Sequence, residues 1–283
     1  MSYSAKILAD SVSPDGHRLT TFELTFPRFI LAEINTHRML SKNSASSRAI
    51  PTEILIKRVK DHPFIPETFN KRVKGMGVGE KFDAAEAGLA RTIWLDARDR
   101  AVQAAQILAD IKLDKSRANR LLEPFMWHTA IISGTDWENF FNLRQPQDGP
   151  VPNFDFPAQP EFQIIARMAR DLYESNEPNK LEYGEWHLPL VSKRFDRHDD
   201  KFIKAAVSAG RCAKVSYDRH TDNELPNNSA ERWYKLREAG HWSPAEHPAM
   251  AVDDGYIGNF KGFKQFRKFY PEEAVFRNIT SDE

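Results

Sequence analysis

The sequence predicts an α+β fold, in which a twisted antiparallel or mixed sheet packs with long helices. Three segments predict it. Residues 18–26, RLTTFELTF, alternate only imperfectly, but their Thr and Phe content is typical of a strand. Residues 82–112 carry an apolar stripe at helical spacing, and residues 161–174, EFQIIARMARDLYE, form an amphipathic helix. A strand and separate long helices indicate layers of both kinds around a core.

The first helix is expected directly after this strand. Pro27 suits the first helical position, and the helix should close at the His37-Arg38 pair, with a serine-rich loop after it. Residues 52–63, TEILIKRVKDHP, predict a short helix that Pro63 stops.

The middle of the chain contains the clearest helix. Its stripe consists of Ala90, Ile93, Ala97, Ala101, Ala104, Leu108 and Ile111. The alanines permit close packing, which predicts a core or subunit-interface element. Residues 70–81, just before it, form a glycine-punctuated loop. Gly75, Gly77 and Gly79 lack the spacing and the preceding strand of a dinucleotide-binding fingerprint.

The second half predicts further helices and one long loop. Residues 115–133 should continue as a helix or helix pair, and residues 145–160 should form a loop because prolines recur in them. Other helices are expected at residues 135–145, capped by Thr135 or Asp136, at residues 200–218 with a turn, and at residues 229–240, capped by Ser229 and ended by Gly240.

Composition limits the functional classes. The chain has 283 residues, enough for one large domain or two small ones. Lys and Arg total 40, as do Asp and Glu, so a generally basic surface for nucleic acid is not indicated. Cys212 is the only cysteine, which excludes an internal disulfide and fits a cytoplasmic location. We expect no membrane span, because no window approaches about 20 apolar residues.

One short stretch combines the residue types that bind a phosphate. Residues 36–50, THRMLSKNSASSRAI, place two arginines among four serines. Arg48 can form bidentate contacts, and Ser46 with loop N–H groups can complete the shell. The same composition also suits a plain polar loop.

Three segments together resemble the flavin-dependent thymidylate synthases. In place of the family's R-H-R signature and its later steps stand Thr36-His37-Arg38, Ser41, Asn43, Ser46 and Arg48. The second segment, NFFNLR at residues 139–144, resembles the family's asparagine-to-arginine helix. The third comprises CAKVSYD at residues 212–218 and AGHWSPAEH at residues 239–247, which are similar to the family's A-R-V-S-F-D and G-H-x-T-P-F-E-H segments.

The order of these segments differs from that of the family. The family's V-S-F-D and G-H-x-T-P segments precede the signature, whereas their counterparts here follow it. We therefore expect a circular permutation of the same fold, which is tolerated when the old termini lie close together. The resemblance covers most of the chain and implies a single catalytic domain over residues 1–283, with insertions near residues 63–82, 145–158 and 178–195.

The resemblance implies a role for each matching residue. Ser46 and Arg48 would bind the nucleotide phosphate, and Arg144 would lie against the pyrimidine ring as the catalytic residue. Its guanidinium would stabilise developing enolate charge, so that no covalent enzyme adduct is needed. The other implied nucleotide-binding residues are Glu33, Ser44 and Arg117, and the implied flavin-binding residues are Thr36, His37, Arg38, Asn43, Asn139, Ser216, His241 and Ser243.

Several of these residues also have a purely structural interpretation. Arg144 suits the C-terminus of any helix, Arg117 suits an exposed helix surface, and His241 suits a packed turn. Glu246 and His247 lack the H-E-x-x-H spacing and a third ligand, so no metal site is predicted.

Four positions depart from the family pattern. Thr36 replaces an arginine, Ser44 replaces an acidic residue, and residues 133–135, Ser-Gly-Thr, replace N-x-R. Fewer long or charged side chains are therefore expected near the flavin. Glu33 replaces a glutamine near the phosphate, where a carboxylate about 4 Å away would be repelled by roughly 4 kcal/mol. Glu33 should therefore turn toward the His-Arg pair, unless the nucleotide sits differently.

The activity implied by the resemblance is reductive methylation of dUMP to dTMP. FAD would carry a hydride from NADPH, and methylenetetrahydrofolate would supply the carbon. A homotetramer with sites built between subunits is also implied, and the stripe of residues 90–111 is the candidate interface. Two alternatives stay open: methylation or hydroxymethylation of another pyrimidine deoxynucleotide, and a non-catalytic nucleotide-binding protein of the same fold.

Overall fold

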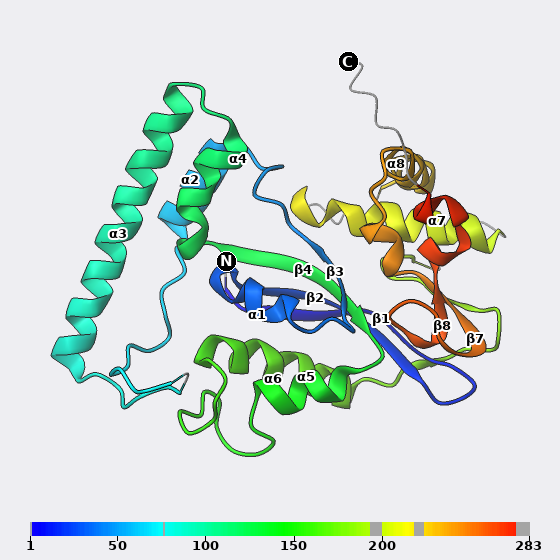
Figure 1. Ribbon diagram of the computed structural model, residues 1–283, viewed down its shortest axis with the longest axis horizontal. Helices are drawn as coiled ribbons and strands as arrows, with labels where there is room; N and C mark the ends of the chain where they lie inside the picture. Colours follow the sequence, from blue (N-terminus) through cyan, green and yellow to red (C-terminus); the bar gives the residue numbers. More distant parts are fainter. Residues whose placement is uncertain (1, 76, 193–199, 218–223, 276–283) are drawn as a thin grey trace.

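The computed structural model describes residues 2–75, 77–192, 200–217 and 224–275, and it combines helices with mixed sheets (Figure 1). The larger sheet has the strand order β3-β4-β2-β1-β5. Its neighbouring strands are antiparallel except β5, which runs parallel to β1. Its strands are β1 (Ser4–Val12), β2 (Arg18–Pro27), β3 (Ser41–Ser44), β4 (Trp127–Gly134) and β5 (Asn179–Lys180).

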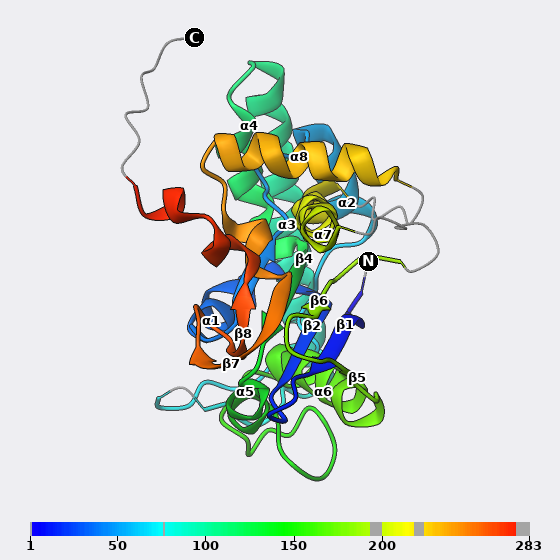
Figure 2. The ribbon, with the colours of Figure 1, turned by 90° about the vertical axis from the view of Figure 1, so that its right-hand side faces the viewer.

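Helices lie on both sides of this sheet, which confirms the predicted α+β class. The α-helices are α1 (Leu31–Asn35), α2 (Thr52–Asp61), α3 (Ala84–Asp110), α4 (Lys115–Ala118), α5 (Trp137–Arg144), α6 (Pro160–Ser175), α7 (Lys201–Cys212) and α8 (Pro226–Glu238). The 3-10 helices are η1 (Arg28–Ile30), η2 (Asn119–Phe125), η3 (Ala213–Tyr217), η4 (Ser243–Glu246), η5 (Phe266–Phe269) and η6 (Pro271–Ala274). Figures 1 and 2 show α5 and α6 on one side of the sheet and α7 and α8 on the other.

The interior strand β4 shows why both faces of the sheet are covered. Successive strand residues point to opposite faces. Ile132 belongs to the core under α5 and α6, whereas its neighbour Ile131 packs against Cys212 and Val215 at the end of α7. Both isoleucines are therefore buried.

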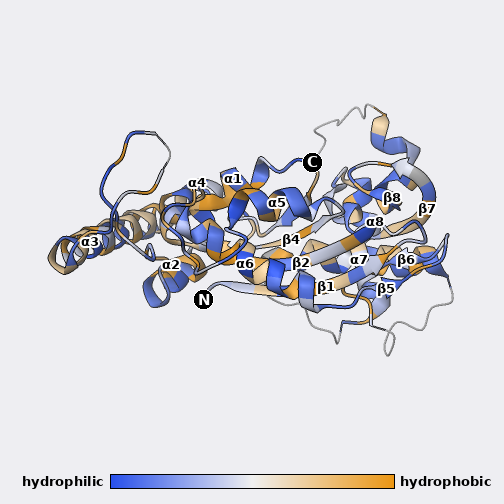
Figure 3. Cartoon of the chain, turned by 90° about the horizontal axis from the view of Figure 1, so that it is seen from below, coloured by the Kyte–Doolittle hydropathy of each residue, from blue (hydrophilic) through white to orange (hydrophobic). Residues whose placement is uncertain are grey.

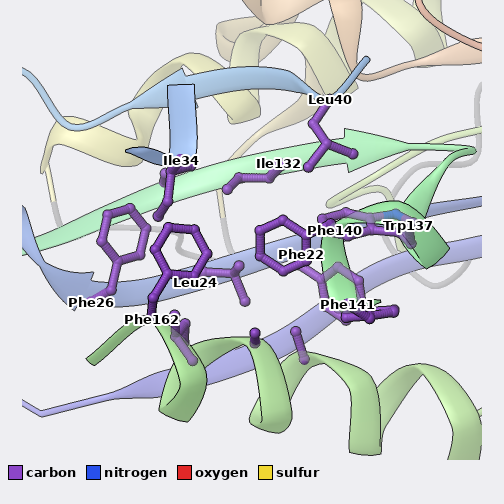
Figure 4. Close-up of a cluster of buried hydrophobic side chains, with 14 of the residues drawn as sticks. Phe22, Leu24, Phe26, Ile34, Leu40, Ile132, Trp137, Phe140, Phe141 and Phe162 are labelled. Carbon is purple, nitrogen blue, oxygen red and sulfur yellow. The ribbon is translucent and has the colours of Figure 1, made fainter. Parts of the chain in front are cut away.

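The main core lies between the sheet and the pair α5 and α6 (Figure 4). Strand β2 supplies Phe22, Leu24 and Phe26, each 0 % exposed. Trp137 at the start of α5 meets Phe22 edge to face, with ring centroids 4.9 Å apart. The predicted strand at residues 18–26 is confirmed, and its apolar residues explain where the core forms.

A second sheet, of order β6-β7-β8, packs beside the first. Its strands are β6 (Trp186–His187), β7 (Ala249–Tyr256) and β8 (Lys261–Gln265). Buried hydrogen bonds join the two sheets. Thr21 Oγ1 lies 2.8 Å from His187 Nε2 and 2.6 Å from Ser133 Oγ, and Ser133 Oγ lies 2.8 Å from His247 Nδ1. We call His187, Thr21, Ser133 and His247 the buried histidine chain.

The buried histidine chain also places the segment around His247 close to β2, as the permuted order requires. His247 reaches Thr21 of β2 through Ser133. Leu19, on the same strand, packs in one cluster with Ala249. The permutation itself, and the single domain with its insertions, stay predictions.

The structure corrects two predicted elements. Residues 41–44 of the expected serine-rich loop form β3, because they pair in register with β4. Residues 127–133, expected to be helical, belong to β4 (Trp127–Gly134), in which the β-branched Ile131 and Ile132 suit a sheet. Helix α1, which precedes β3, ends at Asn35, before the His37-Arg38 pair that was expected to close it.

Helix α8 begins earlier than predicted. Its N-cap residue is Leu225, and Ser229, the predicted cap, lies inside the helix and donates a 2.9 Å hydrogen bond to Glu224 Oε2. Gly240, with φ +79°, follows the helix end as expected. The strands β1, β7 and β8 were not predicted.

The long helix α3 is confirmed and lies at one end of the molecule (Figure 3). Its apolar residues divide into two faces. The inner face, with Val102 and Ala105, packs against α2 and η2. The outer stripe, as we call it, consists of the apolar residues Leu89, Ile93, Ala97, Ala104, Ile107 and Ile111, and the charged Arg100 lies in the same line. Ala101 of the predicted stripe packs instead against the inner cluster. The large members of the outer stripe Leu89, Ile93 and Ile107 are 63, 60 and 55 % exposed.

Helices α7 and α8 approach each other closely at Gly210. A Cβ atom on Gly210 would lie 1.8 Å from the backbone oxygen of Ser229, a distance that no side chain tolerates. Glycine therefore sets the spacing of this helix pair.

Candidate functional site

A pocket of about 720 Å³ lies between the end of β3, η3, η4 and α8. We call it the site pocket. Its lining residues are Asn43, Ser44, Ser46, Ala49, Ala213, Lys214, Arg232, Leu236, His241, Ser243 and Pro244. It brings together the predicted residues Asn43, Ser44, Ser46, His241 and Ser243.

Asn43 ties three segments together at this pocket. Its Nδ2 donates to the backbone oxygen of Cys212 at 2.7 Å, and its Oδ1 accepts from Ser243 Oγ at 3.4 Å. Asn43 and Ser243 lie 200 positions apart in the sequence. The end of β3, the end of α7 and the start of η4 are thus fixed relative to one another.

The turn after β3 is held by partners from outside the pocket. Ser46 Oγ accepts from the backbone N–H of Arg48 at 3.3 Å. Asn119 Nδ2 donates to the backbone oxygens of Ser47 and Ile50 at 2.6 and 3.0 Å. The side chain of Arg48 is exposed and does not line the site pocket.

Two cations in the pocket wall, Lys214 and Arg232, were not predicted from the sequence. Lys214 Nζ lies 2.7 Å from Glu224 Oε1, and Arg232 contacts both oxygens of the same carboxylate. Burial would raise the pKa of Glu224, but hydrogen bonds from Arg232, Lys214 and Ser229 lower it to about 2. Lys214 lies in the CAKVSYD segment, which is the signal that could have identified it.

A second group of predicted residues surrounds Arg144. Arg144 Nε donates to His37 Nε2 at 2.8 Å, and Arg144 Nη2 lies 3.3 Å from Thr36 Oγ1. The guanidinium also lies over the ring of Phe162, 4.6 Å from its centroid. Burial lowers the pKa of Arg144, whereas the charge of Glu33 opposes that effect.

His37 is a neutral acceptor in this group. Burial, together with the charges of Arg144 and Lys42, lowers the pKa of His37 to about 4. Lys42 Nζ donates to the backbone oxygens of His37 and Leu40 at 2.6 and 2.7 Å. Burial lowers the pKa of Lys42 to about 8, against the opposing charge of Glu246. Consecutive residues of β3, Lys42 and Asn43, therefore reach the Arg144 group and the site pocket respectively.

The remaining predicted residues lie outside both groups. Arg38 and Asn139 are exposed. Arg117 is on α4, where it lies 3.8 Å from Asp114 with its side chain 74 % exposed. Ser216 lies in η3, and its side chain falls outside the described part of the chain. Within one chain, the predicted nucleotide-binding residues are thus divided between separate places.

Cys212 is buried behind the site pocket, as expected for a small packing residue. It is 0 % exposed and clusters with Ile131 and Val215. Burial raises the pKa of its thiol well above the usual range. A thiol held in its neutral form is a weak nucleophile.

Two further properties concern the described ranges alone. In them, His, Cys, Asp and Glu side chains form no group of three or more that could hold a metal ion. No helix of these ranges has the length and apolar character needed to cross a membrane.

Comparisons with known proteins place this site in context. No family model and no curated protein matches the chain. Among solved structures, the UMP/dUMP methylase PolB from Streptomyces cacaoi bound with 5-Br UMP is similar with a TM-score of 0.49 and 14 % identity, over 61 % of this chain and 88 % of that chain. The same methylase bound with 5-Br dUMP gives 0.47 and 14 %, over 61 % and 90 %.

Proposed function

We propose that this protein is a flavin-dependent methylase that converts dUMP to dTMP with methylenetetrahydrofolate and NADPH as co-substrates. The supporting observation is the composition of the site pocket. Asn43 and Ser46, from the segment that resembles the family signature, meet His241 and Ser243 from a distant segment there. The resemblance implies that these segments share one site, and their meeting in a single pocket is what such a site requires.

The residues of the site pocket fit a nucleotide-sized group. Its volume of about 720 Å³ lies within the range usual for small-molecule sites. The amide of Asn43, the hydroxyl of Ser243 and the exposed ring of His241 offer hydrogen bonds to the edge of a flavin ring. The flavin, when bound, supplies the hydride. The chain's own part is to hold the ring and to keep the nucleotide beside it.

Arg144 needs a separate explanation, because it lies outside the site pocket of its own chain. We infer that a complete site forms between subunits, so that the Arg144 group of one chain meets the site pocket of another. The Arg144 side chain is only partly buried, so a second chain can reach it. Within one chain, β3 sends Lys42 toward the Arg144 group and Asn43 toward the site pocket.

Mixed assemblies test this arrangement. Arg144→Ala and His241→Ala should each abolish dTMP formation. When the two variants are coexpressed and form mixed oligomers, about a quarter of the sites regain both residues if each site draws on two chains. Measured turnover should recover accordingly. Mixed oligomers as inactive as the single variants would show that both residues act within one chain.

The activity itself is tested with the purified protein. It should bind FAD and form dTMP from dUMP, methylenetetrahydrofolate and NADPH. A panel of pyrimidine deoxynucleotides identifies the base, and mass analysis of the product separates a methyl from a hydroxymethyl group. A protein that binds dUMP but neither binds flavin nor forms product would support the non-catalytic alternative.

The outer stripe of α3 supports the homotetramer as a proposal. Together with Arg100, its members recur every three or four residues and so form one line along the helix. Leu89 and Ile93 lie at one end and Ile107 and Ile111 at the other, with Ala97, Ala104 and the exposed Arg100, which pairs with Asp96, between them. An antiparallel second copy of α3 would set large residues beside large ones, as a two-fold interface requires.

Two charge insertions should therefore dissociate the assembly. We expect Ile93→Glu combined with Ile107→Glu to lower the oligomer mass measured by light scattering, because charges would replace apolar contacts. The matched control is Ile54→Glu on α2, a residue 44 % exposed but outside the stripe, which should leave the mass unchanged. An unchanged mass in the double variant would place the interface elsewhere.

A further inference from the structure

The site pocket contains two cations, Lys214 and Arg232, that have no role in the function proposed above. Of the described residues that line it, Lys214 and Arg232 are charged, and both are cationic. Their side chains are only 22 and 27 % exposed, and that of their shared partner Glu224 is 11 % exposed. Within the part of the chain that the structure describes, two positive charges against one negative charge leave one in excess at the pocket wall. A partly buried excess charge is costly unless an anion compensates it.

Arg232 is held in place by atoms other than those of a ligand. Its Nη1 donates to the backbone oxygen of Gly210 at 3.1 Å and to Glu224 Oε2 at 3.1 Å, and its Nη2 contacts Glu224 Oε1. Among the described residues, these bonds occupy three of the five N–H groups of a guanidinium. The rest can serve a ligand without loss of the existing contacts.

Hydroxyl donors complete the arrangement. Ser44 and Ser46 line the same pocket as the two cations. Cations combined with directional hydroxyl groups are what a phosphate monoester requires. Arg48, by contrast, is exposed and does not line the pocket.

We propose that Lys214 and Arg232, together with Ser44 and Ser46, bind the phosphate group of a nucleoside monophosphate, with Glu224 holding the two cations in position. The proposal depends on the proposed function only for the identity of the nucleoside. It moves the main phosphate contact from Arg48 to the wall formed by η3 and α8.

Calorimetric titration of the full chain with dUMP and with deoxyuridine tests the proposal. Arg232→Ala should weaken dUMP binding roughly 10- to 100-fold, as expected for charged hydrogen bonds, and leave deoxyuridine binding unchanged. Lys214→Ala should act in the same direction. Lys235→Ala is the matched control, since Lys235 is a cation on the same helix that pairs with Glu231 at the exposed surface. It should bind dUMP as the unmodified protein does.

Two further variants keep the test decisive if Arg232→Ala fails to fold. Arg232→Lys keeps the charge but not the planar fork, so it should fold and bind dUMP more weakly. Glu224→Gln removes the charge that holds Lys214 and Arg232 in position, so it should also weaken dUMP binding. Weaker dUMP binding in Arg48→Ala, with unchanged binding in the Arg232 variants, would overturn the assignment.

The outcomes separate this proposal from the proposed function. If dUMP binds and the Arg232 and Lys214 variants bind it equally well, the phosphate assignment is wrong while the activity can stand. If dUMP does not bind but another nucleoside monophosphate does, and requires Arg232, the assignment stands and the substrate is wrong. If no nucleoside monophosphate binds, the phosphate assignment is overturned.

Discussion

Arg144→Ala should keep the fold and the bound flavin but lose dTMP formation by ~10²–10³, the range found when one preorganised electrostatic donor is removed. The guanidinium is fixed by His37 and Phe162, so its charge is placed before substrate arrives. Arg144→Lys should recover little, because an ammonium group copies neither the planar fork nor the ring contact. Single-turnover conversion of dUMP measures the effect.

The control for Arg144 is the only cysteine. Cys212→Ala should fold and keep nearly full turnover, because its buried thiol remains protonated. Flavin reduction followed by stopped flow should be largely unchanged in both Arg144 variants. An inactive Cys212→Ala together with an active Arg144→Ala would instead indicate a mechanism that begins with a thiolate attack on the ring.

Acid should destabilise this protein well above the usual range of carboxylate titration. Burial lowers the pKa of His128, His187 and His247 to about 3 each, from an ordinary 6.5. The unfolded chain therefore binds more protons than the folded one between these values. Stability is complete above pH 6.5 and falls as the pH drops toward 3, by about 1.4 kcal/mol per pH unit for each histidine.

Urea unfolding at pH 7.5 and at pH 5 measures this loss. The free energy of unfolding should fall by about 2 kcal/mol per buried histidine over that interval. His187→Gln keeps a hydrogen-bonding side chain beside Thr21 and should reduce the pH dependence by one histidine's share. Glu224, with a pKa of about 2, contributes at lower pH and does not confuse the comparison. Equal free energies at the two pH values would mean that these histidines titrate alike in the folded and unfolded states, so that burial does not lower their pKa values.

The local sequence predicted those elements whose residue content or spacing is typical of a strand or a helix. The Thr and Phe content of β2 and the spacing of apolar residues along α3 were sufficient, because both are signals within one short segment of the chain. Strand β3 was not predictable in this way. Ser41 and its neighbours resemble a polar loop, and they become a strand because β4 offers the hydrogen-bonding partner. Strand β4 was missed since it directly follows a helical segment without a glycine or a turn motif.

The residues of the candidate site likewise divide into those that a local motif predicted and those that depend on contacts between distant segments. Asn43 and Ser243 were found because a motif names them, and the fold brings them into one pocket. Arg232 carries no motif, and its importance depends on sharing Glu224 with Lys214, a contact between segments. Arg144 was placed on the right helix, but no pattern in one chain states that His37 would be its partner.

The contact at Gly210 has a consequence for how the pocket meets a ligand. The backbone oxygen of Gly210 is one of the groups that fix Arg232, and the same residue keeps α7 against α8. Arg232 is therefore anchored both to main chain and to the Glu224 carboxylate before a ligand binds. A guanidinium already immobilised loses little conformational entropy when an anion arrives. The wall should consequently be a preorganised binding site, in which an anion binds with a small loss of conformational entropy and little movement of the protein.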